Sequence, residues 1–350
     1  MRPSVAIVGV GGVGGVVGAC LATAGRCDLT LLARGAGLER LRHSGLDVTR
    51  HDGQHIHCKP AVANAQDAAA VGPQDFVLWT TKAQQMPDSA ATVAALCGPT
   101  TRVVPMQNGM PYWWFKSYGG PLEGSRLTAD DHAVWRAVPP SRVIGCMHYV
   151  AGQVTSDDHG TPVSWLSKWP ADKATLSFGE IAHASERPSG GGSVSTLASL
   201  FESPELPLDT HCLAPGAIRR AVLEKIKVNA SINTLSAMTR MDCGDLTATA
   251  SSRDALRRIC AEVDALAAAL DPPLPLQPGG EYILERYGGQ HGLLPSMLQD
   301  LNAGRPLERV ALVTALVALG ERLGVATPSL ALMDALLEGV ESVSSNYKPP

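Results

Sequence analysis

The feature that most constrains the fold is a run of closely spaced glycines directly after a short apolar segment. Residues 5–8 predict a buried strand, and the sequence Gly9-Val10-Gly11-Gly12-Val13-Gly14 follows at once. Residues 16–24 predict a helix with a face of small side chains, and residues 29–33 predict a second strand. A strand, a glycine-rich turn, a helix and a strand in this order form a βαβ unit. The N-terminal part of the chain is therefore expected to be α/β.

The glycines fit the G-x-G-x-x-G pattern, in which each glycine has a separate role. Gly9 permits the tight turn, Gly11 lets the main chain approach a pyrophosphate, and Gly14 lets the helix pack closely on the strand. The helix N-terminus then offers free N–H groups and the positive end of its dipole to the phosphates. We expect a dinucleotide site that also includes Gly12 and Val13; a packing turn without a ligand is the alternative.

The residue after the second strand selects between the two nicotinamide dinucleotides. An NAD site places Asp or Glu there for the ribose 2′-hydroxyl, whereas this chain has Arg34. Arginine forms charge-assisted hydrogen bonds with a 2′-phosphate, each worth about 1.5–3 kcal/mol. The expected cofactor is NADP(H), unless Arg34 is an ordinary surface arginine.

Further apolar runs at residues 76–80, 102–105 and 143–150 predict additional strands. Their alternation with helical stretches is typical of a doubly wound parallel sheet, whose ligands lie beyond the carboxyl ends of the strands. Lys82 follows the first of these runs and Asn108 follows the second, so both are expected at the mouth of the cofactor crevice.

Helices rather than alternating strands follow residue 213, and the composition changes near residues 205–215. A chain of 350 residues is long enough for two cores. We therefore expect a dinucleotide-binding Rossmann-type α/β domain at residues 1–210 and an all-α domain at residues 211–350 that carries the substrate-binding and catalytic groups.

In the helical part, Lys225, Asn229 and Asn233 recur every four residues, which places them on one face of one helix. Asparagine is a poor helix former, so the stripe indicates a polar cleft; an ordinary exposed face is the alternative. Further along, Ser296 is expected near the N-cap of a helix and Glu308 one turn into the next helix. Capping and the helix dipole alone would explain those two residues.

Composition and charge exclude several classes of protein. Residues 5–24 imitate a signal peptide or a membrane span, but they contain six glycines and little Leu or Ile. A net charge of -4 without a basic run argues against nucleic acid or an anionic membrane as a partner. Eight cysteines without a C-x-x-C pair favour reduced thiols in a cytoplasmic protein. The alternating His51, His55 and His57 lack a distant partner ligand, so no metal site is expected.

Together these residues resemble one family. The glycine motif, Lys82, Asn108-Gly109, the K-x-x-x-N-x-x-x-N helix, and Ser296-Met297-Leu298-Gln299-Asp300 with Glu308 are similar to those of the ketopantoate (2-dehydropantoate 2-) reductases. The resemblance implies NADPH-dependent reduction of a 2-oxo acid, as in pantothenate biosynthesis. It also implies that the substrate lies in the cleft between a Rossmann domain and a helical domain, and that the chain forms a homodimer through the helical domain.

The resemblance also implies a role for individual residues. Lys225 matches the family's general acid, which protonates the carbonyl oxygen as hydride arrives. Glu308 matches the acid that holds the substrate's hydroxyl group and helps to position the lysine. The other matches are Asn229, Asn233, Ser296 and Asn108 for the substrate, Lys82 and Asn108 beside the nicotinamide ribose and the reacting carbon, and Arg34 for the 2′-phosphate.

Several departures from the family pattern leave the substrate open. Cys243 and Leu293 stand where further asparagines are common, which predicts a pocket less suited to a terminal hydroxyl group. Glu308-Arg309-Val310 stands where E-I-D is usual. The aromatic residues 112–115 either wall a larger substrate site or pack in a subunit interface. Two alternatives therefore stay open: a reductase or dehydrogenase of another 2-oxo or hydroxy acid, and a non-catalytic NADP(H)-sensing protein.

Overall fold

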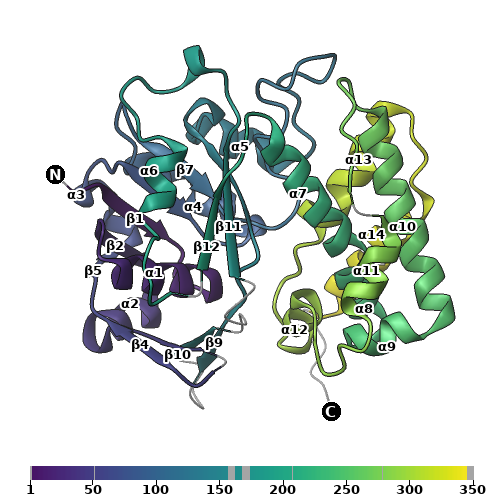
Figure 1. The fold of residues 1–350 in the computed structure, drawn as a ribbon, viewed down its shortest axis with the longest axis horizontal. Coiled ribbons are helices and arrows are strands. Elements are labelled where there is room, and N and C mark those ends of the chain that lie inside the picture. The colour runs from purple at the N-terminus through teal and green to yellow at the C-terminus, as the bar shows by residue number, and fades with distance from the viewer. Residues whose placement is uncertain are drawn as a thin grey trace. The chain divides into compact units, whose positions relative to one another are not determined.

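The computed structural model describes residues 2–50, 52–156, 162–167, 174–206, 208–277 and 279–344 (Figure 1). The chain divides into two compact units. The first comprises Met1–Gln107 and His132–Ile218, and the second comprises Asn108–Asp131 and Arg219–Pro350. The expected boundary after residue 210 differs from this division in two ways. Residues 208–212 form a strand of the first unit, and the segment at 108–131, expected in the first domain, belongs to the second.

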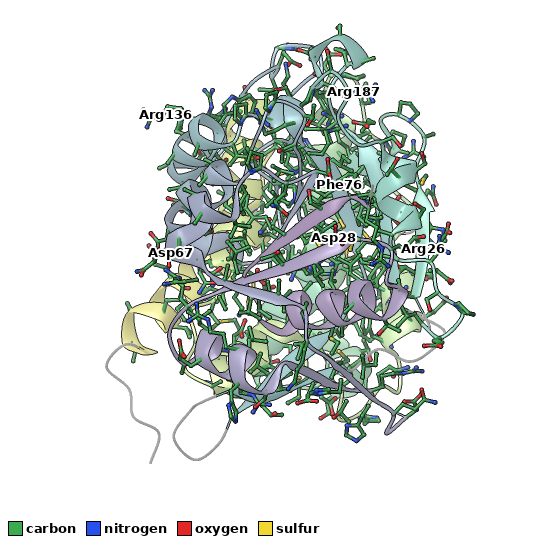
Figure 2. All side chains as sticks on the ribbon, turned by 90° about the vertical axis from the view of Figure 1, so that its left-hand side faces the viewer. Arg26, Asp28, Asp67, Phe76, Arg136 and Arg187 are labelled. Atoms are coloured by element: carbon green, nitrogen blue, oxygen red, sulfur yellow. The ribbon has the colours of Figure 1, made fainter. Side chains whose placement is uncertain are left out.

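A five-stranded parallel sheet forms the centre of the first unit, in the order β5-β2-β1-β6-β7. Because the strand order reverses between β1 and β6, this sheet has the switch point at which doubly wound folds bind ligands. Figure 2 labels Asp28 and Phe76, the first residues of β2 and β6; the glycine motif lies at the opposite, carboxyl ends. The strands are β1 Ser4–Val8, β2 Asp28–Ala33, β5 Ala61–Asn64, β6 Phe76–Trp79 and β7 Arg102–Pro105.

Helix α1, Gly12–Ala24, packs against this sheet and also against a second sheet in the order β4-β3-β10-β9. Residues 14–21 are buried without interruption. A helix that is covered on both sides is apolar all round, which explains why this segment imitates a membrane span. None of the helices in the described residues is long and apolar enough to cross a membrane. The second sheet contains β3 Leu46–Thr49, β4 His55–Cys58, β9 Gly152–Ser156 and β10 Pro162–Ser167.

The strand expected at residues 143–150 forms as β8, Ile144–His148, but not in the parallel sheet. It pairs antiparallel with β11, Ala174–Glu180, which pairs in parallel with β12, Leu208–Cys212. A single bridge from Val143 to Val103 connects this segment to the parallel sheet. The remaining elements before the boundary are α2 Gly35–Ser44, η1 Ala65–Asp67, α3 Ala68–Val71, η2 Ala83–Gln85, α4 Met86–Ala95, α5 Ala129–Ala137, η3 Pro140–Arg142, η4 Ala184–Glu186 and α6 Val194–Ser199.

The second unit is helical in all its described elements, as expected. Helix α10 packs against α9, α11, α13 and α14, which are drawn in green to yellow in Figure 1. Leu256, Ile259, Val263 and Leu266 lie on its buried stripe at helical spacing. Two π-helices, η5 and η6, interrupt the regular helices. The elements are α7 Ala217–Val228, η5 Asn229–Asn233, α8 Thr234–Thr239, α9 Cys243–Ala248, α10 Ala250–Ala269, α11 Gly280–Tyr287, α12 Ser296–Asn302, η6 Val310–Thr314, α13 Ala315–Leu323 and α14 Pro328–Ser344.

Candidate functional site

The glycine turn after β1 is tightly packed at its first and last glycines. Gly9 has a φ of +102°, and a Cβ there would lie 2.6 Å from Cγ2 of Thr81. The Thr80 hydroxyl donates to the Gly9 carbonyl at 2.6 Å. A Cβ on Gly14 would overlap that same carbonyl oxygen. Both positions therefore need glycine for conformation and packing, as the motif predicts.

Gly11 has the opposite environment. It is exposed, and a Cβ built there would meet no atom within 4 Å. It is also the N-cap of α1, whose first turn has neither a capping side chain nor an acidic residue. An open main chain at an uncapped helix N-terminus fits a pyrophosphate. Gly12 packs closely against Gly152 of β9, and Val13 packs against the core of the first unit.

Side chains at the carboxyl ends of three neighbouring strands are tied together. Thr80 links the end of β6 to the glycine turn, and the Gln107 amide donates to the carbonyls of Trp79 at 2.7 Å and Thr81 at 3.0 Å. Lys82 follows as the N-cap of η2 and is partly buried. Thr80 and Gln107 were not singled out from the sequence. Their signal is a polar side chain directly after a buried strand.

Arg34 directly follows β2 and is the N-cap of α2. It is exposed, and its guanidinium makes no hydrogen bond or ion pair with any described residue. A Cβ on Gly35 or Gly37 would meet no atom within 4 Å, so the main chain beside Arg34 is open as well. A free guanidinium beside an uncapped helix start fits a phosphate group.

In the second unit, the loop that begins at Asn108 docks on the π-helix η6. Gly109 has a φ of +89°, and a Cβ there would lie 2.6 Å from the carbonyl of Ala311. Met110 N donates to that carbonyl oxygen at 2.7 Å. The loop brings Asn108 to Glu308, where Nδ2 donates to Oε2 at 3.3 Å. Two residues separated by 200 positions in sequence are thus paired within one unit.

Glu308 is buried, with 8% of its surface exposed, and lies at the start of its helix rather than one turn inside it. Its carbonyl accepts from Leu312 N at 3.1 Å, and the next residue, Arg309, is the N-cap of η6, so Glu308 lies just before this helix. The carboxylate that contacts Asn108 is thus carried by the residue that directly precedes a helix.

The stripe of Lys225, Asn229 and Asn233 runs from the last turn of α7 through η5, so it lies on an α-helix that continues as a π-helix. Lys225 and Asn229 are partly exposed and Asn233 is buried. Asn233 Nδ2 donates to the Ser296 hydroxyl at 3.4 Å. Ser296 is the first residue of α12, next to the N-cap Pro295, so it lies near the N-cap as expected but is not itself the cap. Single-turn π-helices inside α-helices are frequent at functional sites.

The π-helix η5 packs against both α12 and η6. The pair Asn233–Ser296 and the pair Asn108–Glu308 therefore lie on, or directly beside, elements of the second unit that pack together, and we call these four residues the cluster of the second unit. The cluster offers amide, hydroxyl and carboxylate groups, with the lysine of α7 one turn before Asn229. Such a set can bind a small oxygen-rich acid and supply a proton.

The two departures from the family pattern lie next to each other. Cys243 N donates to the Leu293 carbonyl at 3.0 Å. The Cys243 thiol is buried, and this burial, reinforced by Asp242, raises its pKa to about 12. Leu293 is 44% exposed. The apolar character expected at these positions is thus presented by Leu293, whereas Cys243 faces the protein interior.

The aromatic residues Tyr112, Trp113, Trp114 and Phe115 are all buried. Arg219 Nε donates to the Trp114 carbonyl at 2.8 Å, and the Arg219 guanidinium stands over the ring of Tyr118. These contacts make the segment part of the interior of the second unit.

The histidines of the β3–β4 hairpin, which were considered as metal ligands, are hydrogen-bonded to neighbouring side chains. His55 pairs with the Thr49 hydroxyl at 3.1 Å and His57 with the Asp47 carboxylate at 2.6 Å. His51 lies outside the described residues. His148 of β8 is buried, and its Nε2 lies 3.0 Å from the Met106 carbonyl oxygen, so it is a hydrogen-bonded core residue.

Known proteins resemble both units. Residues 5–111 match the family model of ketopantoate reductase PanE/ApbA, and residues 217–341 match its C-terminal model. A 2-dehydropantoate 2-reductase of Mesorhizobium japonicum is 33% identical over 337 residues, which cover 95% of this chain and 96% of that protein.

Solved structures of similar fold include members of the same family. One named as a ketopantoate reductase, from Ralstonia solanacearum MolK2, has a TM-score of 0.84 and 32% identity, covering 99% of this chain and 100% of that chain. D-mandelate dehydrogenase with NADH and anilino(oxo)acetate has the same fold, with a TM-score of 0.79 at 18% identity over 98% of this chain and 99% of that chain. The chain therefore belongs to the ketopantoate reductase family, whose members are oxidoreductases that act on a CH–OH group with a nicotinamide dinucleotide.

Proposed function

We propose that the protein reduces a 2-oxo acid to the 2-hydroxy acid with NADPH, and that 2-dehydropantoate is its substrate. The observation that carries the proposal is the cluster of the second unit, in which Asn233–Ser296 and Asn108–Glu308 are hydrogen-bonded pairs on elements that pack together. An uncapped helix start after the glycine turn supports the dinucleotide half of the proposal.

The cofactor supplies the hydride, and the residues of the first unit hold it. The open main chain at Gly11 and the N-terminal amides of α1 bind the pyrophosphate. Arg34 pairs with the 2′-phosphate, which favours NADPH over NADH. Lys82 extends from the carboxyl end of β6 toward the nicotinamide ribose.

The residues of the second unit hold the substrate and move the proton. Ser296 and the two asparagines of η5 bind the carboxylate and neighbouring oxygen atoms of the substrate. Lys225 donates its proton to the carbonyl oxygen while the carbon accepts hydride, so the product leaves as an alcohol. Glu308, held by Asn108, binds the substrate's hydroxyl group and keeps Lys225 in place. In this proposal the protein acts in the cytoplasm as a homodimer.

A second candidate is a reductase of a more apolar 2-oxo acid. It is favoured by one observation, the exposure of Leu293 and Leu294 just before Ser296. Apolar side chains at that place would bind a branched or aromatic substituent better than a terminal hydroxyl group.

The test follows the loss of NADPH absorbance with 2-dehydropantoate and with branched and aromatic 2-oxo acids. Lys225→Ala is expected to lower turnover about a hundredfold or more, because general acid catalysis is lost. Arg220→Ala, which removes an exposed cation from the same helix, is the control and is expected to retain activity.

Three outcomes separate the alternatives. Turnover of 2-dehydropantoate that needs Lys225 supports the proposal. Activity on another acid that still needs Lys225 keeps the chemistry and changes the substrate. Tight NADPH binding without turnover of any acid would identify an NADP(H)-sensing protein instead.

A further inference from the structure

The residues on either side of Glu308 are both held by one carboxylate of the last helix. Leu307 N donates to Glu341 Oε1 at 3.2 Å. Arg309 Nε donates to Glu341 Oε2 at 3.0 Å. Glu341 lies in α14, near the end of the described chain. The two oxygens of Glu341 thus bracket Glu308, one through the main chain before it and one through the side chain after it.

Arg309 makes further contacts with the same helix. Its Nη1 donates to Asp334 at 2.7 Å, and its Nη2 lies 3.5 Å from Glu338. The Thr314 hydroxyl also donates to Asp334 at 2.7 Å, which ties η6 to the same carboxylate. The acids at positions 334, 338 and 341 recur at helical spacing and face one arginine whose side chain is largely buried. Charge-assisted bonds of this kind are shorter and stronger than neutral ones.

Helix α14 is itself firmly placed. Leu330 and Leu337 are fully buried on its inner face, and the helix packs against η6, α8 and α10. At its N-terminal end, Glu262 of α10 accepts from Ser329 N at 2.8 Å and from Leu330 N at 2.9 Å. The helix is therefore fixed at the start by Glu262 and near its end by the contacts of Glu341, so it can act as a rigid support.

We propose that Glu341, acting with Arg309, is a positioning residue for the reaction, which sets the main chain at Glu308 and thereby the direction of the Glu308 carboxylate. The inference rests on the proposed function, in which Glu308 binds the substrate and keeps Lys225 in place. Asn108 binds the carboxylate of Glu308, while Glu341 binds the main chain of Leu307 and the side chain of Arg309 on either side of it. Neither Glu341 nor Arg309 needs to touch the substrate for this role.

The kinetic test uses Glu341→Leu with Glu338→Gln as the matched control. Glu338 also faces Arg309, but its side chain is 69% exposed and it makes no bond to Leu307 N. Glu341→Leu is expected to lower kcat/KM for the 2-oxo acid about tenfold to a hundredfold, the effect of a small misplacement of a binding group. NADPH affinity is expected to stay the same in both variants, and Glu338→Gln is expected to keep kcat/KM within about twofold.

A double mutant distinguishes positioning from general damage. If Glu341 acts through Glu308, then adding Glu341→Leu to Glu308→Ala is expected to lower kcat/KM by less than about twofold beyond the effect of Glu308→Ala alone. Losses that multiply in the double mutant, or a fall in NADPH affinity, would overturn the proposal.

Hydrogen exchange tests the same contact without turnover. Main-chain amides of residues 305–314 are expected to exchange faster in Glu341→Leu than in the wild type, and to be unchanged in Glu338→Gln. Should Glu341→Leu not fold, Glu341→Gln keeps an acceptor for Leu307 N while losing the charge on Arg309, and it is expected to give a smaller increase. Unchanged exchange in this segment would refute the contact. A wild type that reduces no 2-oxo acid would refute the proposed function, while the exchange data would still decide the role of Glu341.

Discussion

Two lysines separated by one residue on α7 have opposite environments. Lys225 is partly exposed, whereas Lys227 is 1% exposed and pairs with Asp264 at 2.8 Å. We predict that Lys227→Met lowers the free energy of unfolding by about 1–3 kcal/mol, because Asp264 loses its charged partner. Asp264 remains 40% exposed, so water limits the cost. Urea denaturation measures the loss, and kcat/KM should stay within about twofold. A loss of activity equal to that of Lys225→Ala would contradict this division of roles.

Cofactor preference is predicted to depend on Arg34. Arg34→Ala removes an exposed cation whose guanidinium pairs with none of the described residues, so stability should not change. The preference for NADPH over NADH should fall about tenfold to a hundredfold, which corresponds to one or two charge-assisted hydrogen bonds. The control is Arg42→Ala, an exposed arginine of the same helix that pairs with Glu39. Dissociation constants for both dinucleotides give the ratio, and an unchanged ratio would show that Arg34 is only a surface residue.

Thiol reactivity is predicted to follow burial. Burial raises the pKa of Cys243 to about 12 and that of Cys20 to about 12, so at pH 8 their thiolate fraction is on the order of one in ten thousand. Cys212 is exposed. Iodoacetamide should therefore label Cys212 in the folded protein and reach Cys243 and Cys20 only after unfolding, as peptide mass spectrometry can show. Rapid labelling of Cys243 would mean that the start of α9 opens in solution.

Among the elements, the glycine turn assigns cofactor binding and close packing to different glycines, which the motif alone does not distinguish. Gly11→Ala fits the observed φ of -93°, and its methyl group meets no protein atom, so the melting temperature should hardly change while NADPH binding weakens. Gly14→Ala forces a methyl group onto the Gly9 carbonyl and should cost about 1–3 kcal/mol of stability. Thermal denaturation with and without NADPH distinguishes the two. Equal losses of stability in both variants would refute the open space assigned to Gly11.

The same elements show which structural features the sequence pattern predicts and which it does not. The turn from Gly9 to Gly14 could be predicted because the conformation and close packing of each glycine depend on neighbours within one βαβ unit. The π-helices could not be predicted, because the four-residue spacing from Lys225 to Asn233 fits a regular α-helix just as well. Glu308 was expected one turn inside a helix, and the structure places it just before η6, whose N-cap is Arg309. The strand β8 was predicted, but its partner β11 lies some 30 residues further along the chain, and local pattern does not specify such pairing.

At the scale of the whole chain, the two units are not successive halves. The segment 108–131 leaves the first unit and contributes to the second, through Met110 N on Ala311 O and the Trp114 carbonyl on Arg219. The composition change at residues 205–215 indicates only one of the points at which the chain passes from one unit to the other. The aromatic residues 112–115 could belong to the core of either unit, so their composition does not indicate the passage near residue 108. Asn108 shows the consequence, because sequence placed it with the cofactor strands and the structure pairs it with Glu308.

This interleaving predicts that a single cut cannot yield two stable pieces. A fragment of residues 219–344 lacks the Trp113 and Trp114 side chains and the loop that covers η6, so it should lose the cooperative unfolding of the full chain. Joining residues 108–131 to its N-terminus through a flexible linker restores the missing contacts in the right unit and should restore cooperative melting. Circular dichroism on both fragments measures the difference. Equal, cooperative melting of the fragment without residues 108–131 would mean that the segment is only an appendage, because the contacts of Met110 and Trp114 would then add nothing that the helices lack.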